Sequence, residues 1–357
     1  MKKYFSHLLN KKTIIAVMLL IFAMFLLGGC EGKSDTEITT LKVGVTMYDE
    51  YDPFTTAIAN SISEKLKVFA QEQNLNIICD VVYSNKSQLQ QNDQVENFID
   101  KGYDVVCVNL VDRTDAMQII DKAKSNDIPV IFFNRELVEE DLERFDKLYY
   151  VGAAPEESGR YQAEIIVDIL SDPARFSQCD FSNDGVIQYV MLEGEAGHQD
   201  AMVRTKVSVE EIQNAGFKLE KISDKIANWN REQAETKMLS ILEGHPWQIE
   251  LVIANDDNIA LGALDALEDF GVPELPLIVG VNGEKEVIDD IINGQIAGTV
   301  YNNGYQMGEI IAKMAISLGT QDKIPEDITL EKGKYVFAPY EKIDKDNAKD
   351  YLDKAIY

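Results

Sequence analysis

The chain has 357 residues, and its 61 acidic against 34 basic side chains give a formal net charge of −27 at pH 7. A charge of this sign and size repels a phosphate backbone, which argues against a nucleic-acid-binding protein. The length exceeds the ~250–300 residues at which one hydrophobic core usually stops growing, so two lobes are expected.

Residues 1–29 have the pattern of a bacterial signal peptide, with four lysines before the uninterrupted apolar run 14–27. A helix of that length rises only ~21 Å, which is too short for a hydrocarbon layer of ~30 Å. The run ends in Leu27-Gly28-Gly29-Cys30, and small residues before a cysteine resemble a lipobox. We expect cleavage after Gly29 and a lipid on Cys30, followed by a polar linker over 30–40. The alternative is an ordinary signal peptide in which Cys30 stands by chance.

From Lys42 onward, short β-branched runs alternate with amphipathic stretches. The predicted strands are 42–47, 76–84, 104–110, 128–134, 147–152, 186–192, 250–256, 275–282 and 296–303. The predicted helices are 54–70, 95–101, 116–124, 157–170, 201–215, 232–242, 259–270 and 305–318. Strands that are nearly all apolar are buried on both faces, which is typical of parallel sheets flanked by helices. The sequence therefore predicts an α/β, doubly wound architecture in two lobes.

Polar side chains follow five of the predicted strands. They are Asn109, Asn134, the run Asn255-Asp256-Asp257, Asn282, and the pair Asn302-Asn303. Each one alone is more often a turn former or a helix N-cap. Together they favour a binding site, because ligands of open parallel sheets bind outside the carboxyl ends of the strands. Amides and carboxylates suit a neutral polyhydroxylated ligand better than an anion.

Several classes of enzyme are not indicated. The chain has no GxGxxG or GxxxxGK[ST] phosphate loop and no GxSxG nucleophile motif, and its three histidines leave little for a zinc site. Cys79, Cys107 and Cys179 are an odd set without paired spacing, so they do not form a disulfide framework. Nucleotide-dependent enzymes, zinc enzymes and hydrolases with a nucleophile elbow are therefore disfavoured.

One loop has the ligand order of a calcium-binding loop. Oxygen-bearing side chains stand at its positions 1, 3, 5 and 9, which are Asp180, Ser182, Asp184 and Gln188, with a glycine at position 6. Position 12, which needs a bidentate Glu, is Met191. The residues alone leave two interpretations open, a calcium site and an Asp/Asn-rich turn.

A second cluster follows the predicted strand 186–192. His198, Asp200 and Arg204 lie where a loop leads into a helix, and the last two share a helix face at i,i+4. They form either a surface ion pair or a ligand-binding group, in which the guanidinium could donate to adjacent hydroxyls. Phe54 stands at the turn after the first predicted strand, and Trp229 stands just before a predicted helix. Their aromatic faces could pack on the CH faces of a sugar ring, although core or loop packing would explain either residue alone.

Several segments resemble the D-galactose/D-glucose-binding proteins of bacterial ABC importers, in collinear order from Lys42 to the last helix. They include TMYDEYDPF, PVIFFNRE, YYVGAAPEESG, DFSNDGVIQYVMLEGEAGHQDAMVRT, IELVIANDD and AGTVYNN. The resemblance implies a type I periplasmic binding protein with two α/β lobes joined by three crossover segments near 133–136, 301–303 and 336–338. The lobes would comprise 41–133 with 303–336, and 134–302 with 337–357.

The resemblance also implies the roles of individual residues. Sugar contacts would come from Asp52, Phe54, Asn109, His198, Asp200, Arg204, Trp229, Asp256, Asn282 and Asn302. Calcium would be held by Asp180, Ser182, Asp184, the Val186 carbonyl, Gln188 and Glu250, the last supplying the missing carboxylate.

Three departures from the family pattern fall on these residues. Asp256 stands where the family usually has Asn, Asn282 where it has Asp, and Ser182 where it has Asn. The first two relocate a carboxylate and an amide in the sugar site, which could retune the site to another pyranose. The third replaces an amide with a hydroxyl, a weaker calcium ligand.

The resulting expectation is a lipid-anchored, extracytoplasmic and monomeric sugar-binding protein that works with an ABC permease. An alternative is a sugar sensor that docks on a chemoreceptor or a sensor kinase, which would need the same fold and site. A repressor's ligand domain is excluded by the signal sequence and by the lack of a helix-turn-helix before Leu41.

Overall fold

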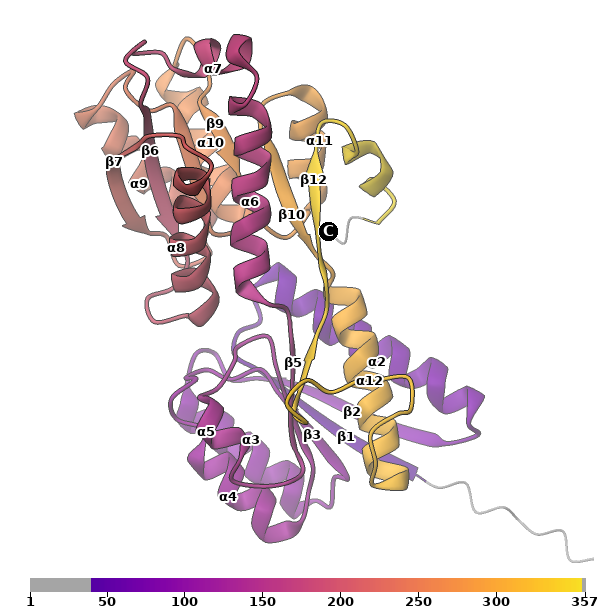
Figure 1. The fold of residues 1–357 in the computed structure, drawn as a ribbon. Coiled ribbons are helices and arrows are strands. Elements are labelled where there is room, and N and C mark those ends of the chain that lie inside the picture. The colour runs from indigo at the N-terminus through magenta and orange to yellow at the C-terminus, as the bar shows by residue number, and fades with distance from the viewer. Residues whose placement is uncertain (1–39, 355–357) are drawn as a thin grey trace, which may run out of the picture. The chain divides into compact units, whose positions relative to one another are not determined.

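Two six-stranded β-sheets, each flanked by helices, make up the part of the chain that the computed structural model describes, residues 40–354 (Figure 1). The signal peptide expected at 1–29, the lipidation site Cys30 and the linker as far as residue 39 lie outside the described residues. Within residues 40–354, no helix combines the length and the apolar character that crossing a membrane requires.

The first sheet is entirely parallel and has the strand order β11-β5-β4-β3-β1-β2. Its strands are β1 (Thr40–Met47), β2 (Asn76–Tyr83), β3 (Val105–Val108), β4 (Val130–Phe133), β5 (Leu148–Gly152) and β11 (Tyr335–Phe337). The helices of this lobe are α2 (Pro53–Glu72), α3 (Gln88–Asp100), α4 (Met117–Asn126), α5 (Glu139–Leu142) and α12 (Gly304–Gln321).

The second sheet has the order β12-β10-β9-β8-β6-β7 and is parallel except for β12, which is antiparallel to β10. Its strands are β6 (Ile187–Glu193), β7 (Leu219–Ile226), β8 (Leu251–Ala254), β9 (Leu277–Val279), β10 (Gly298–Asn302) and β12 (Tyr340–Asp344). Its helices are α6 (Pro155–Leu170), α7 (Pro173–Cys179), α8 (Gln199–Asn214), α9 (Arg231–Gly244), α10 (Asp257–Phe270) and α11 (Lys285–Asn293), with a 3₁₀ turn at Ala348–Tyr351.

The central strands confirm the expectation of sheets covered on both faces. Every residue of β3, β4 and β8 is buried, and their sequences VVCV, VIFF and LVIA are wholly apolar. The edge strand β7, with the sequence LEKISDKI, has no fully buried residue. Its charged pattern explains why the apolar runs of the sequence did not indicate it.

One predicted crossover is wrong. Strand β5 pairs with β4 and β11 in the first sheet, so the chain does not leave this lobe at 133–136. Instead, Asn134 adopts a left-handed conformation (φ 61°), and the chain turns through α5 and returns as β5. The chain changes sheet between Gly152 and Pro155, between Asn302 and Gly304, and between Phe337 and Tyr340.

We therefore define the N lobe as residues 40–152 with 304–337 and the C lobe as 155–302 with 340–354. The N lobe is built from two separate stretches of chain, and so is the C lobe.

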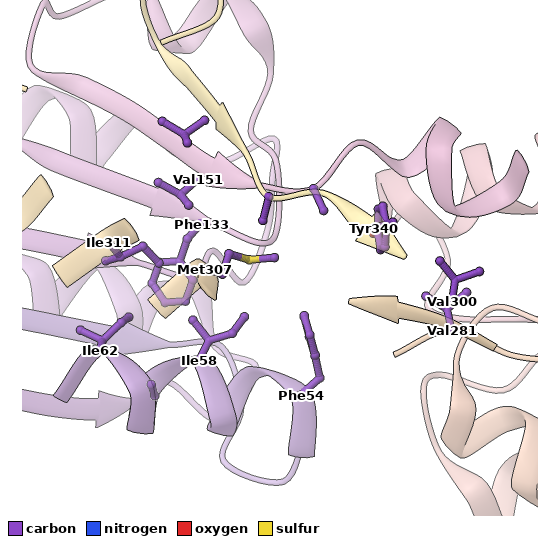
Figure 2. Packing of buried hydrophobic residues seen from close by; sticks show 14 of the residues in the cluster. Phe54, Ile58, Ile62, Phe133, Val151, Val281, Val300, Met307, Ile311 and Tyr340 are labelled. Atoms are coloured by element: carbon purple, nitrogen blue, oxygen red, sulfur yellow. The ribbon is translucent and has the colours of Figure 1, made fainter. Parts of the chain in front are cut away.

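The core of the N lobe forms where α2 and α12 pack together beside the sheet. Ile58 and Ile62 of α2 lie beside Met307 and Ile311 of α12, next to Phe133 (Figure 2). The two helix backbones approach closely at Gly308. A Cβ atom there would lie 2.5 Å from the Ser61 Cβ and 2.9 Å from the Ile58 carbonyl oxygen.

We expect Gly308→Ala to destabilise the protein by about 1–3 kcal/mol, because the added methyl group forces two packed helices apart. Urea denaturation measures the change. Gly244→Ala is the matched control, since a Cβ at this last residue of α9 meets no atom within 4 Å. The control should keep or slightly raise stability. Equal stability of the two variants would contradict the packing described.

Candidate functional site

A cavity lies between the carboxyl ends of the two sheets, lined by residues of both lobes. In the first sheet, the chain goes to opposite sides of β1 with β2 and β3. In the second sheet, it does the same around β6 with β7 and β8. Such a change of direction opens a crevice at the ends of the strands, which is where α/β proteins bind their ligands.

The structure brings nine of the ten predicted sugar-contacting residues to the wall of this cavity. They are Asp52, Phe54, His198, Asp200, Arg204, Trp229, Asp256, Asn282 and Asn302. Asn109 is not among the lining residues. It is fully buried, and its amide nitrogen donates to the Phe133 carbonyl oxygen (3.1 Å) and to Asn134 Oδ1 (3.0 Å). Its position is one layer behind the wall, where it supports Asn134.

Two of the cavity carboxylates are also helix N-caps. Asp52 Oδ1 accepts the Thr55 N–H of α2 at 3.0 Å, and Asp256 Oδ1 accepts the Ile259 N–H of α10 at 2.9 Å. The second oxygen of Asp52 accepts the Tyr48 hydroxyl at 2.6 Å. Capping and cavity-lining are therefore compatible, because the start of each helix holds its carboxylate at the cavity wall.

Arg204 is the buried cation of the C-lobe wall. Its Nε donates to Ser158 Oγ (2.7 Å), its Nη1 to the Asn255 carbonyl oxygen (2.8 Å) and its Nη2 to the Tyr340 hydroxyl (2.9 Å). Asp200 Oδ2 lies 3.6 Å from Nη2. Burial raises the pKa of Asp200 to about 6, although the neighbouring guanidinium acts in the opposite direction.

Aromatic rings line the cavity from both lobes, Phe54 from α2 and Trp229 from the loop before α9. The His198 ring meets the Trp229 ring edge-on, with 5.0 Å between centroids. Burial and three nearby guanidinium groups hold the pKa of His198 well below its usual value, so the imidazole is neutral at pH 7. Among residues 40–354, His198 Nδ1 and Asn302 Oδ1 find no hydrogen-bond partner although both atoms are buried.

Sequence reasoning missed four polar residues that line the cavity, namely Tyr48, Thr55, Arg135 and Asn258. Asn134, which also lines the cavity, was noted at a strand end but was not assigned a sugar contact. Tyr48 and Arg135 directly follow predicted strands, so their positions carried a signal. Nothing in the sequence indicated which groups Arg135 contacts.

The guanidinium of Arg135 lies over the Tyr48 ring, 3.9 Å from its centroid. It donates to the Val111 carbonyl oxygen at 3.1 Å and forms an ion pair with Glu195. Arg135 follows β4 of the N lobe and Glu195 follows β6 of the C lobe. The ion pair therefore joins the two lobes at the edge of the cavity.

Carboxyl groups at the C-lobe strand ends are strongly affected by burial. Burial, helped by Asp52 and Asp257, raises the pKa of Asp256 to about 8. Burial and charge repulsion from Asp257, Asp256 and Asp52 raise the pKa of Glu284 to about 9. Asp257 is satisfied by the Thr299 hydroxyl and by two backbone N–H groups, those of Gly283 and Glu284.

The predicted calcium loop folds around Asp180, whose carboxylate accepts the backbone N–H groups of Asp184 (3.1 Å) and Gly185 (2.9 Å). Glu250 is remote in sequence and nearly completely buried, yet it closes the loop. Its two oxygens accept the Ser182 N–H at 2.9 Å and the Gln188 N–H at 3.0 Å.

Side-chain oxygens of the loop lie near one another. Ser182 Oγ is 3.1 Å from Asp180 Oδ1 and 3.4 Å from Gln188 Oε1, and Gln188 Nε2 donates to Asp184 Oδ2 at 3.1 Å. Over the described residues, no group of three or more His, Cys, Asp and Glu side chains has a metal-binding arrangement. A cation here would need the hydroxyl, amide and carbonyl oxygens of the loop as well as its carboxylates, which is the mixed oxygen set that calcium accepts.

Comparison with known proteins gives consistent results. A family model described as a periplasmic binding protein domain matches residues 43–323. A D-galactose/methyl-galactoside binding periplasmic protein of Haemophilus influenzae is 36% identical over 314 residues, which cover 87% of this chain and 92% of that protein. The ribose import binding protein of Bacillus subtilis is 24% identical, with 76% and 78% of the two chains covered.

Among solved structures, an ABC transporter solute-binding protein from Bacillus halodurans with bound myo-inositol has a TM-score of 0.74 to this chain. The sequences are 24% identical, and the match covers 89% of this chain and 99% of the other. At this identity the likeness concerns the fold.

We expect Asp256→Asn to stabilise the folded protein above pH 5. Folding raises the pKa of the Asp256 carboxyl from 3.8 to about 8, so its contribution to the free energy of unfolding falls as the pH rises through that window. The asparagine amide has no proton to lose, so the variant escapes this loss. The gain at about pH 9 should be at least ~1.4 kcal/mol, the equivalent of one pKa unit, and should shrink towards pH 4. Asparagine still caps α10.

Thermal denaturation across this pH range measures the difference. Asp269→Asn, on the exposed side of the same helix, is the matched control and should show no such trend. A pH-independent difference between Asp256→Asn and the unmodified protein would contradict the raised pKa of Asp256.

Proposed function

The chain belongs to the family of periplasmic binding proteins, and on that premise we propose that it is the substrate-binding component of an ABC importer for galactose- or glucose-type sugars. It is a sugar-binding component of transport and not an enzyme. The finer proposal concerns the ligand, and its support is the composition of the cavity wall together with the 36% identical galactoside-binding relative.

The observation that carries the proposal is the placement of Phe54 and Trp229 on a cavity whose other lining residues are mostly polar and include amides, carboxylates and guanidinium groups. A pyranose has apolar CH faces and a rim of hydroxyl groups. Aromatic rings bury the faces, while carboxylate oxygens accept from the hydroxyls and guanidinium N–H groups donate to them. The unpartnered His198 Nδ1 and Asn302 Oδ1 are suited to the same rim.

Binding requires no bond to be made or broken. Asp52 and Phe54 belong to the N lobe, whereas Asp200, Arg204 and Trp229 belong to the C lobe. A sugar held by one lobe would recruit the other through rotation about the three connecting segments, which is hinge closure. The closed form would be recognised by the membrane permease.

The choice of sugar would depend on Asp256 and Asn282, which both line the cavity. Asp256 has one oxygen engaged by the Ile259 N–H, so the other can take a sugar hydroxyl. Neutral hexoses fit a carboxyl in either ionisation state, because the protonated form donates and the ionised form accepts. We propose D-glucose or D-galactose as the ligand, with lipid attachment at Cys30 holding the protein at the outer face of the membrane.

We expect glucose or galactose to change the tryptophan fluorescence of the chain from Glu31 in a saturable manner. Xylose and ribose, which lack the sixth carbon, should bind more weakly. Trp229→Ala should weaken binding by at least ~100-fold, because a central stacking surface is lost. The matched control is Trp247→Phe, which removes the second tryptophan, an exposed residue outside the cavity.

Titration calorimetry with the same four sugars supplies the affinities without relying on fluorescence. If neither hexose binds while another sugar does, the galactose/glucose assignment is wrong and the Asp256/Asn282 exchange marks a different ligand.

For the loop at 180–188 we propose a structural calcium ion held by Asp180, Ser182, Asp184, the Val186 carbonyl, Gln188 and Glu250. The support is the convergence of these oxygens and the burial of Asp180 and Glu250. Burial raises the pKa of Glu250, as expected of a buried carboxyl that a cation would stabilise in its ionised form.

We expect calcium to raise the melting temperature relative to the protein in EDTA, because a ligand that binds only the folded state stabilises it. Glu250→Gln should abolish the calcium-dependent difference, whereas Glu243→Gln, on the exposed end of α9, should preserve it. A melting temperature insensitive to calcium in the unmodified protein would refute the site and favour a plain turn.

A further inference from the structure

Trp229 is held in an unusual backbone conformation. Both Asn228 (φ 54°) and Trp229 (φ 58°) are in the left-handed region, which few residues other than glycine occupy and a bulky side chain rarely does. Such a conformation persists only where neighbouring contacts impose it. Here the Ala227 N–H donates to the Glu193 carbonyl oxygen (2.8 Å), and the Asn228 N–H donates to the Gly194 carbonyl oxygen (3.3 Å).

The Trp229 ring lies directly on Gly194. A Cβ atom built on Gly194 would be 2.1 Å from Cη2 and Cζ2 of the indole and 2.5 Å from Cε2. Real Cβ atoms essentially never come within 3.0 Å of another heavy atom, so any side chain at 194 must displace the ring or the loop.

Backbone freedom does not explain this glycine. Gly194 is not among the residues with positive φ, so its conformation is open to alanine. Its own N–H donates to Asn255 Oδ1 at 3.0 Å, which fixes the backbone beneath the ring. The missing side chain is therefore required for space.

The indole is also braced by the edge-on ring of His198, with 5.0 Å between the ring centroids. The indole is thus confined by the Gly194 backbone and by His198, both in the segment that follows β6. These contacts lie within the C lobe, so they do not depend on closure of the cavity.

We propose that Gly194 is a positioning residue that sets the plane of Trp229 and thereby the depth of the aromatic wall on which the ligand stacks. The inference rests on the proposed function, since it assumes a ligand with a flat CH face, such as a pyranose. A methyl group at position 194 would push the indole by ~1 Å or more to restore van der Waals contact. The stacking surface would then lie at a depth that no longer fits the ring thickness of the sugar.

The test uses the chain from Glu31 with the substitution Trp247→Phe, so that Trp229 is its only tryptophan. We expect Gly194→Ala to shift the Trp229 emission maximum without ligand and to weaken hexose binding by at least ~10-fold. Gly244→Ala, where a Cβ meets no atom within 4 Å, is the matched control and should change neither quantity.

A second pair of variants separates positioning from general destabilisation. The Trp229→Phe substitution keeps an aromatic face but removes the outer indole atoms that would collide with a Cβ at position 194. In a Trp229→Phe protein, Gly194→Ala should therefore change the affinity less than about twofold, which is below ~0.4 kcal/mol. If Gly194→Ala alone does not fold but the double variant does, the contact is also supported.

Two results would overturn the proposal. One is parental affinity and unshifted emission in Gly194→Ala. The other is an equal loss of affinity on Gly194→Ala whether position 229 keeps its tryptophan or carries the Trp229→Phe substitution. If the parent binds no sugar at all, the proposed function fails, while the emission of ligand-free Trp229 still decides whether Gly194 sets its position.

Discussion

The satisfaction of one buried charge organises the C-lobe side of the cavity. Arg204 cannot be neutralised and would be strongly unfavourable without partners, so its guanidinium must be surrounded by acceptors. Those acceptors come from α6, from the end of β8 and from β12, and Asp200 lies one turn before Arg204 in α8. Because Tyr340 is the first residue of the returning strand β12, one interaction ties a connecting segment to the wall of the binding site.

Rigid helix ends carry the other functional groups. Asp52 and Asp256 are N-caps, and His198 occupies the N-cap position of α8 with Asp200 in its first turn. The partial positive charge at a helix start stabilises a nearby carboxylate, while burial and neighbouring acids oppose ionisation. For Asp256 the second influence prevails, since its pKa rises. The result is a set of polar groups that keep their positions before any ligand arrives, which reduces the entropy that binding must overcome.

Periodicity and strand-end chemistry predicted much of this structure. Apolar runs indicated the buried strands, and the polar residues after them indicated the cavity, because the carboxyl ends of parallel strands share one edge. Individual roles, the Glu250 assignment above all, came from family resemblance. The membership of β5 in the N lobe was missed, since no local signal says which sheet a strand joins. The ion pair of Arg135 with Glu195 was missed because it links positions far apart in sequence.

The interleaving of the two lobes along the chain also dictates an order of events in time. The N lobe needs α12 and β11, and the C lobe needs β12, all of which lie beyond residue 303. Neither half can therefore mature as an autonomous early unit while the chain is still emerging, in contrast to the usual domain-by-domain sequence. Both must finish almost together once the last few dozen residues appear. A chain truncated there would lose an edge strand from both sheets at once, which would leave the backbone hydrogen-bonding groups of β5 in one sheet and of β10 in the other open to pairing with another chain.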